Sequence, residues 1–337
     1  MPLLLSANAP DAIDIAALRL KAGSLVGLPT ETVYGLAADA GNASAVRRIF
    51  EAKGRPSDHP LIVHIAPADA GGWRAAVAPF VREVPDFAAA LMQAFWPGPL
   101  TLILPRRPDV AAVAAGGQDS VGLRCPSHPV AQALLVAARG QGVMGVAAPS
   151  ANRFGRVSPT TAAHVAEEFA DLSDADLLIL DGGACPVGIE STIVDCSRGA
   201  PVLLRPGMLT PQQLAAACGQ PLRERDAEAP RASGTLASHY APRAKVRLMP
   251  ADQIQAALDV LGSDAKNIAV YARSPLRMAN KTLPQRRMAA DATGCAQELF
   301  AALRELDATG VRLIWVETPP SGPEWDGVRD RLERAAA

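Results

Sequence analysis

Aromatic residues are scarce in this chain of 337 residues: they make up 4% of it, whereas hydrophobic residues as a whole make up 49%. The cores are therefore expected to consist mainly of Ala, Val, Leu and Ile. The scarcity also argues against an RNA-binding module, because such modules stack bases on exposed aromatic rings. The net charge of −1 argues against a surface that binds nucleic acid throughout and leaves room only for a local basic cleft.

Cysteine is also rare and never occurs as a Cys-x-x-Cys pair. The five cysteines are scattered, at positions 125, 185, 196, 218 and 295. Because a disulfide framework or a structural zinc site needs paired or closely spaced cysteines, we expect buried thiols in a reducing cytoplasm instead. No other group of residues has the spacing of metal ligands.

Targeting and membrane segments are not apparent either. Residues 1–10 contain three leucines but no basic segment, and they are too short for a secretion signal. No stretch reaches the apolar length of a membrane span. We therefore expect a cytoplasmic protein.

The length favours two domains. In residues 1–208 strands alternate with helices early and crowd together late, which predicts a twisted mixed sheet with helices packed outside it. Residues 209–244, polar and charged after a short helix at 210–218, predict a linker that also serves as a lid. Residues 245–337 predict a small Rossmann-like α/β domain, which carries no Gly-x-Gly-x-x-Gly and no P-loop. The strands predicted for the first domain are 25–28, 61–65, 100–104, 120–124, 143–147, 177–180, 192–195 and 202–204.

The most informative stretch runs from Pro29 to His64. Its first residues, Pro-Thr-Glu-Thr-Val-Tyr-Gly-Leu, follow a predicted strand, and polar side chains at a strand end suit a small-molecule site in an α/β sheet. Further on, Lys53 and Arg55 flank a glycine just after a predicted helix at 43–52. Two cations this close repel each other unless an anion such as a phosphate chain lies between them. Spacing alone fits a solvated helix terminus equally well.

Further short blocks follow this stretch, and their order is informative. They are residues 60–64 (PLIVH), 96–101 (WPGPLT), 121–124 (VGLR), 148–152 (APSAN), 188–193 (GIESTI) and 204–207 (LRPG). Each block alone is weak. Together with the first motif and Lys-x-Arg, and in this order, the blocks resemble the threonylcarbamoyl-AMP synthase family of YrdC type over the first 207 residues. With its added second domain, the chain resembles the long form of that family.

The resemblance implies a nucleotidyltransferase, an L-threonylcarbamoyladenylate synthase. In this reaction L-threonine, bicarbonate and ATP give threonylcarbamoyl-AMP and pyrophosphate, and the product passes to the machinery that makes threonylcarbamoyl-adenosine in tRNA. Mg²⁺ is implied as an ion bound with ATP, with few protein ligands. The expected partners are these substrates and the tRNA threonylcarbamoyl-transfer machinery, with no membrane and no stable nucleic-acid binding.

The resemblance also implies roles for individual residues. Lys53 and Arg55 are expected to be catalytic, by clamping the ATP phosphates, and Arg124 is expected to pair bidentately with the threonine carboxylate. Asn152 is expected to brace its turn, and Glu190 to be structural. The predicted ATP-binding residues are Lys53, Arg55, His59, Ser120, Ser150, Ser158, Arg205 and Tyr240, and the predicted L-threonine-binding residues are Thr32, His64, Arg124, Ala148 and Ser191.

Taken singly, several of these residues have ordinary structural explanations. Thr32 can cap a turn, His64 can be a satisfied core residue, and Arg124 can form a surface ion pair. Ser120 and Ser158 can be plain strand-end or helix-cap hydroxyls.

The sequence departs from the family pattern in two places. The long form carries a His-Tyr-Ala-Pro segment that folds over the active site, which makes Tyr240 a candidate lid residue. Basic residues usually precede that segment, and Leu236 and Ser238 stand there instead. At His59 the family commonly has Asn, and a histidine there is sensitive to pH in a way that Asn is not.

Two other functions compete with the synthase. Hydrogenase-maturation carbamoyltransferases contain a related domain, but they also carry zinc-finger segments, which the lack of Cys-x-x-Cys argues against. An RNA-binding module without catalysis is disfavoured by the near-neutral charge and the few aromatic residues.

Overall fold

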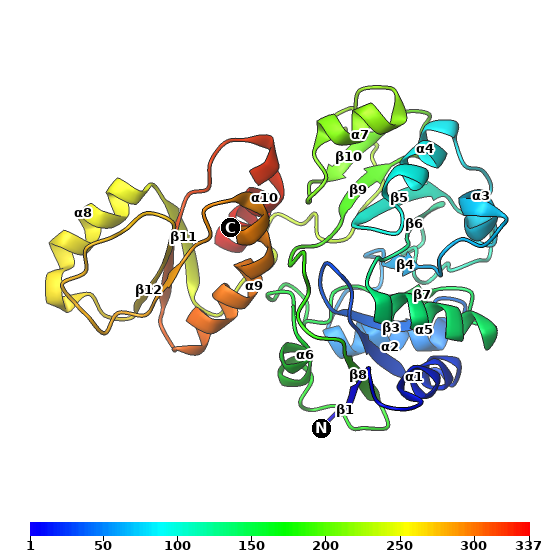
Figure 1. Cartoon of the computed structure of the whole chain (residues 1–337), viewed down its shortest axis with the longest axis horizontal. Coiled ribbons are helices and arrows are strands. Elements are labelled where there is room, and N and C mark those ends of the chain that lie inside the picture. Colours follow the sequence, from blue (N-terminus) through cyan, green and yellow to red (C-terminus); the bar gives the residue numbers. More distant parts are fainter.

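The computed structural model describes residues 1–337 as two domains joined by an irregular segment (Figure 1). The first domain is built on a ten-stranded mixed sheet with the order β1-β8-β2-β3-β7-β4-β6-β5-β9-β10. Its strands are β1 (Leu3–Ser6), β2 (Leu25–Leu28), β3 (Gly35–Asp39), β4 (Ile62–His64), β5 (Leu100–Pro105), β6 (Ser120–Arg124), β7 (Val146–Ala147), β8 (Leu177–Asp181), β9 (Thr192–Asp195) and β10 (Val202–Arg205). Its helices are α1 (Ala12–Lys21), α2 (Ala43–Lys53), α3 (Gly72–Val77), α4 (Asp86–Phe95), α5 (Pro129–Gly140), α6 (Ala162–Glu168) and α7 (Pro211–Cys218).

Helices cover the two faces of this sheet unequally. The helices α2, α4, α6 and α7 pack on one face and form the largest apolar core. On the other face, α1 and α5 cover the end formed by β1, β8, β2, β3 and β7, in a separate core. Over the rest of that face, Ile103, Ile193 and Leu204 contact Ala232 of the irregular segment instead of a helix. This uncovered half of the sheet is where a site can form.

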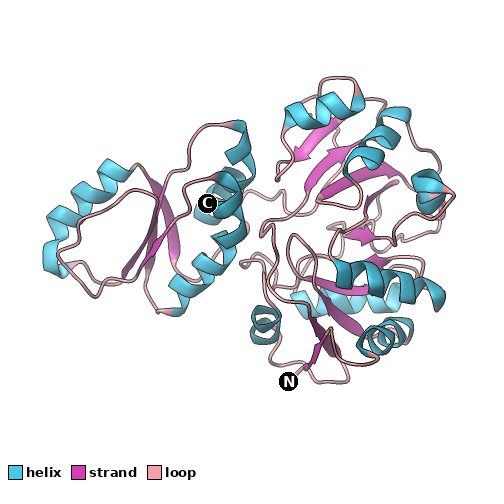
Figure 2. Ribbon diagram, in the orientation of Figure 1, coloured by secondary structure: helices cyan, strands magenta, loops and turns pink.

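The second domain is a parallel four-stranded sheet with the order β11-β14-β12-β13. Alternate residues of β12 point to opposite faces: Val270 packs toward α8, whereas Ala269 and Tyr271 pack toward α9 and α10. Figure 2 shows α9 and α10 lying between this sheet and the first domain. The elements are β11 (Lys245–Met249), α8 (Ala251–Leu261), β12 (Ile268–Ala272), β13 (Gln285–Arg287), α9 (Ala292–Ala308), β14 (Leu313–Glu317) and α10 (Asp326–Ala336).

The domains meet in an interface that is both apolar and charged. The rings of Tyr240 and Phe300 of α9 pack with their centroids 5.4 Å apart, and Ile189 belongs to the same apolar cluster. Arg304 of α9 pairs with Glu168 of α6 at 3.0 Å. The helices of the second domain thus pack directly behind the segments that carry the predicted site motifs.

The predicted fold class is confirmed, with a mixed sheet and outer helices followed by a small parallel α/β domain. The sequence prediction missed β1, β3, β13 and α3. The third strand reads Gly-Leu-Ala-Ala-Asp, and because such small residues rarely favour strands, its central place depends on tertiary packing. The helix α4 begins at Asp86, because Pro85 disfavours helical backbone in the residue before it.

Leu214 of α7 is buried in the core of the first domain, α7 ends at its left-handed C-cap Gly219, and Arg223 beyond it still pairs with Val202 of β10. All five cysteines are free thiols, and only Cys218 is not fully buried, as expected. No helix of the structure combines the length and the apolar character needed to cross a membrane.

Candidate functional site

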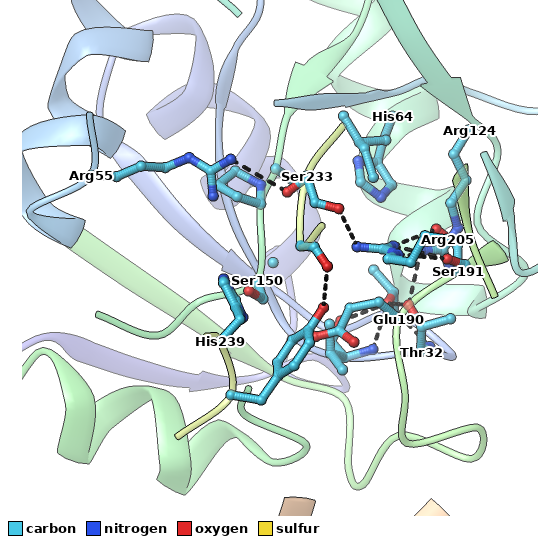
Figure 3. A pocket seen from close by; sticks show the side chains of 18 residues that line it. Thr32, Arg55, His64, Arg124, Ser150, Glu190, Ser191, Arg205, Ser233 and His239 are labelled. Carbon is cyan, nitrogen blue, oxygen red and sulfur yellow. Dashed lines mark hydrogen bonds between the residues drawn. The ribbon is translucent and has the colours of Figure 1, made fainter. Parts of the chain in front are cut away.

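A partly open cavity lies on the half of the sheet that no helix covers. Strand register explains its charged residues: β4 and β6 run parallel, and His64 lies directly beside Arg124. Figure 3 shows Arg205, from β10, entering the same space. The residues that line the cavity are Thr30, Thr32, Val33, Gly35, Arg55, Ile62, His64, Arg124, Ala148, Pro149, Ser150, Glu190, Ser191, Arg205, Ser233, Gly234, His239 and Tyr240.

The loop of the β2–β3 hairpin fixes the hydroxyl groups at one end of the cavity. Thr30 Oγ1 donates to the carbonyl oxygen of Val33 at 2.6 Å and accepts the N–H groups of Thr32 and Val33, each at 3.2 Å. The turn holds Thr32 Oγ1 so that it accepts a hydrogen bond from Arg124 Nη1 at 2.8 Å. This segment is therefore the loop of a β-hairpin, whose second strand, β3, was not predicted from the sequence.

Arg124 forms a buried ion pair, so a surface ion pair does not explain it. Its Nη2 lies 2.6 Å from Glu31 Oε1, with the two side chains 4% and 5% exposed. Its Nε donates to the carbonyl oxygen of Gly98 at 3.2 Å. Contacts on three sides of the guanidinium thus determine where Arg124 points.

Two further arginines share one serine of the irregular segment (Figure 3). Arg205 Nη1 donates to the carbonyl oxygen of Ser233 at 2.8 Å, and its Nη2 donates to that of Ser191 at 2.8 Å. Arg55 Nη2 donates to Ser233 Oγ at 3.4 Å. Burial lowers the pKa of Arg55 to about 10, which leaves the guanidinium charged at neutral pH. The two cations converge on one point, as a site for phosphate oxygens requires.

Residues 231–240, which we call the strap, close this side of the cavity. Arg231 anchors one end by pairing with Asp58 at 2.9 Å, and the N–H of His239 bonds the carbonyl oxygen of Arg334 at the other end, at 3.1 Å. Gly234 has a φ of +72°, and a Cβ there would lie 2.4 Å from Tyr240 Oη. Tyr240 itself has a φ of +63°, and this left-handed conformation is energetically unfavourable for any residue other than glycine. These anchors and backbone angles therefore fix the conformation of the strap over the cavity.

The cavity brings together every predicted threonine-binding residue and, of the predicted ATP-binding residues, Arg55, Ser150, Arg205 and Tyr240. The remaining predicted residues do not line it. His59 lies outside, with its ring edge-on to Phe154 at 5.5 Å. Ser120 lines a smaller neighbouring pocket that shares Ile62 and Ser233 with the cavity. Ser158 does not line the cavity, but its Oγ donates to Oε1 of Glu190, which does. Their contacts with ATP stay predictions.

Lys53 likewise does not line the cavity. Its Nζ donates to the carbonyl oxygens of Ser150, at 2.6 Å, and Asn152, so it holds the turn after β7. Burial, followed by the charge of Arg55, keeps the pKa of Lys53 well below its usual value. Asn152 Nδ2 donates to the carbonyl oxygens of Arg153 and Arg156 at 2.7 and 2.9 Å, which confirms that Asn152 braces this turn. A direct contact between Lys53 and phosphate stays a prediction.

We expect Lys53→Met to lower the free energy of unfolding by about 2–3 kcal/mol, because two buried carbonyl groups lose their donor. Turnover should fall as well, since the turn that presents Ser150 to the cavity loosens. Urea unfolding followed by circular dichroism measures the first effect. Arg47→Met, an exposed change on the same helix, is the control. Equal stability of the two variants would contradict the bracing role.

Several buried polar atoms at the cavity have no partner within the protein. They include Arg55 Nε, His64 Nδ1 and His239 Nδ1. Burial lowers the pKa of His64 to about 3, so its ring is neutral at pH 7. Because buried polar groups are nearly always hydrogen-bonded, these atoms are free to bond a ligand or water in the cavity. No group of three or more His, Cys, Asp or Glu residues is placed to hold a metal ion.

The sequence prediction missed several residues that the structure places at the site. Thr30, Ser233 and Gly234 line the cavity without having been predicted to do so. Glu190, expected to be structural, also lines it and pairs with Arg331 of α10 at 2.8 Å. The His-Tyr-Ala-Pro motif signalled the strap as a whole, but no local signal marks Arg331.

Comparisons with known proteins agree with this geometry. Residues 19–207 match the family of Sua5, YciO and YrdC proteins described as "Telomere recombination", and residues 209–337 match the C-terminal domain of threonylcarbamoyl-AMP synthase. The chain is 37% identical to the threonylcarbamoyl-AMP synthase of Pyrococcus abyssi over 96% of this chain and 94% of that one. It is 39% identical to that of Bacillus subtilis over 98% and 94%.

A solved structure is similar over both domains. The crystal structure of P. abyssi Sua5 complexed with L-threonine has a TM-score of 0.87 and 36% sequence identity, and the match covers 100% of this chain and 97% of that one. The relatives thus share both domains and the segment between them. With two matching family regions and relatives similar over nearly their whole length, this chain belongs to the threonylcarbamoyl-AMP synthases, a family of nucleotidyltransferases that use ATP.

Proposed function

We propose that the cavity holds L-threonine and ATP side by side, with bicarbonate between them, and that the chain there makes threonylcarbamoyl-AMP and pyrophosphate. The observation that carries the proposal is the convergence of Arg55, Arg124 and Arg205 on one cavity with the hydroxyls of Thr32 and Ser191. Three guanidinium groups suit one carboxylate and a chain of phosphates. The product adenylate would then pass to the tRNA threonylcarbamoyl-transfer machinery.

L-threonine is proposed to occupy the end of the cavity near the β2–β3 loop. The guanidinium of Arg124 would bind the threonine carboxylate in place of the Thr32 hydroxyl, which it now contacts at 2.8 Å. The unpartnered Nδ1 of neutral His64 would bond the polar groups of the amino acid. Ala148 and Ser191, which also line the cavity, are proposed to contact the amino acid as well.

The ATP phosphates are proposed to lie at the strap end, between Arg55 and Arg205, beside Ser150 and Tyr240. Both arginines now donate to Ser233, so the strap has to shift when a triphosphate takes over these donors. Ser120 would be reached through the neighbouring pocket. Mg²⁺ would travel with the triphosphate and neutralise part of its charge.

The chemistry needs a nucleophile, a leaving group and a dry site. The threonine nitrogen attacks the carbon of bicarbonate, water leaves, and a carbamate remains. A carbamate oxygen then attacks the α-phosphorus, the bond to the bridging oxygen breaks, and pyrophosphate leaves with the electron pair. The arginines stabilise the charge that develops on the phosphates, and the strap shields the carbamate from water.

Pyrophosphate release tests the proposal. We expect release only when L-threonine, bicarbonate and ATP are all present, together with a product whose mass is that of threonylcarbamoyl-AMP. Release without threonine or without bicarbonate would contradict it. Salt-sensitive retention of tRNA without ATP would instead favour an RNA-binding module.

A further inference from the structure

One arginine of the last helix of the second domain contacts Glu190, a residue that lines the cavity. Arg331 of α10 is 0% exposed, although arginine is rarely buried completely. Its Nε donates to Glu190 Oε2 at 2.8 Å, its Nη2 donates to the carbonyl oxygen of Glu190 at 3.1 Å, and its Nη1 donates to that of Pro206 at 2.9 Å. The guanidinium also lies 5.4 Å from the centre of the Tyr240 ring.

Glu190 is the one carboxylate among the residues that line the cavity. It stands among the cations on which the phosphates would depend, and a bare negative charge there would repel them. Burial favours the neutral form of Glu190, but Arg331, Arg205 and the hydroxyl of Ser158 outweigh that effect and keep its pKa below the usual value. The carboxylate is therefore charged and depends on partners for its neutralisation.

The second carboxylate near Arg331 is already satisfied. Asp330 accepts a hydrogen bond from Arg331 Nη1 at 2.7 Å and also pairs with Arg334 at 2.8 Å. Two arginines of α10 thus face two carboxylates, and removal of Arg331 would leave Glu190 without its closest cation.

We propose that Arg331 is a positioning residue for the adenylation reaction, which neutralises Glu190 and supports the Tyr240 ring so that the cavity accepts a triphosphate. The second domain then forms part of the active site, although it has no nucleotide motif of its own. This inference rests on the proposed placement of ATP between Arg55 and Arg205.

The test is a double-mutant cycle on Arg331 and Glu190, read as KM for ATP and KM for L-threonine in the pyrophosphate assay. We expect Arg331→Met to raise KM for ATP about tenfold, the cost of losing a charge-assisted hydrogen bond, and to change KM for threonine less than about twofold. In the Glu190→Gln background the same change should raise KM for ATP less than about threefold, because no charge is left to neutralise. Arg331→Lys, which keeps the charge, should recover most of the affinity.

Arg329→Met is the matched control, since Arg329 lies on the same helix but bonds only Asp326 and the carbonyl oxygens of Pro320 and Gly322. If Arg331→Met does not fold, Arg331→Gln, which also removes the charge but keeps a hydrogen-bond donor, takes its place in both backgrounds. An unchanged KM for ATP, an equal rise in both backgrounds, or an equal rise in the two KM values would each overturn the proposal. The wild-type dependence on threonine and bicarbonate tests the proposed function separately, because the cycle is read only against an active wild type.

Discussion

Replacing Arg124 with methionine is expected to lower the free energy of unfolding by about 3 kcal/mol and to abolish threonine-dependent turnover. The reason for the first effect is Glu31, whose side chain is 5% exposed and would be left buried without its cation. The second effect follows because the proposed ligand of the threonine carboxylate is gone. Denaturant unfolding and pyrophosphate release measure the two effects on the same preparation.

The variant Arg124→Met with Glu31→Gln separates stability from activity. It removes both charges, so most of the lost stability should return. Activity should not return, because the guanidinium is still missing. A double variant that regained turnover would show that Arg124 serves only to neutralise Glu31, and the proposed threonine site would be wrong.

Sequence motifs anticipated much of this site because they mark the ends of short strands. His64 and Arg124 are the last residues of two strands, and they lie opposite each other in the register of the sheet. Their side chains therefore point to the same face. Once the motifs are placed at strand ends, their convergence follows from regular sheet geometry. The same reasoning predicted the small second domain, whose strands alternate with clear helices.

The parts that were missed depend on contacts between residues distant in sequence. The third strand is rich in alanine and becomes a strand only because β2 and β7 flank it. Lys53 looks like an exposed helix terminus in the sequence, whereas the turn at Ser150 buries it. Arg331 meets Glu190 across 141 positions of the sequence, and nothing in the sequence near either residue indicates that pairing.

Arg124→Met is expected to lose both stability and activity, whereas Arg55→Met should lose activity alone. We expect turnover to fall by about 10²–10³-fold, the usual loss when a donor to a charged transition state is removed. The free energy of unfolding should stay the same or rise slightly. Methionine loses the hydrogen bonds that Arg55 Nη2 donates to the carbonyl oxygen of Pro60 at 3.0 Å and to Ser233 Oγ at 3.4 Å. It also removes a buried charge and the unpartnered Nε, and it can still pack against Phe154, which the guanidinium now faces at 5.7 Å, so the gains offset the loss.

The measurement is kcat from pyrophosphate release together with urea unfolding, with exposed Arg47→Met as the control for loss of an arginine. A residue kept for structure would show a loss of stability at least as clear as the loss of turnover. A residue kept for its ligand shows the reverse, because a buried charge without a carboxylate partner adds little to stability and is explained by the phosphate that binds it. Turnover within tenfold of wild type would therefore show that Arg55 does not bind the phosphates. Arg205 would then be the one arginine of the proposed phosphate site.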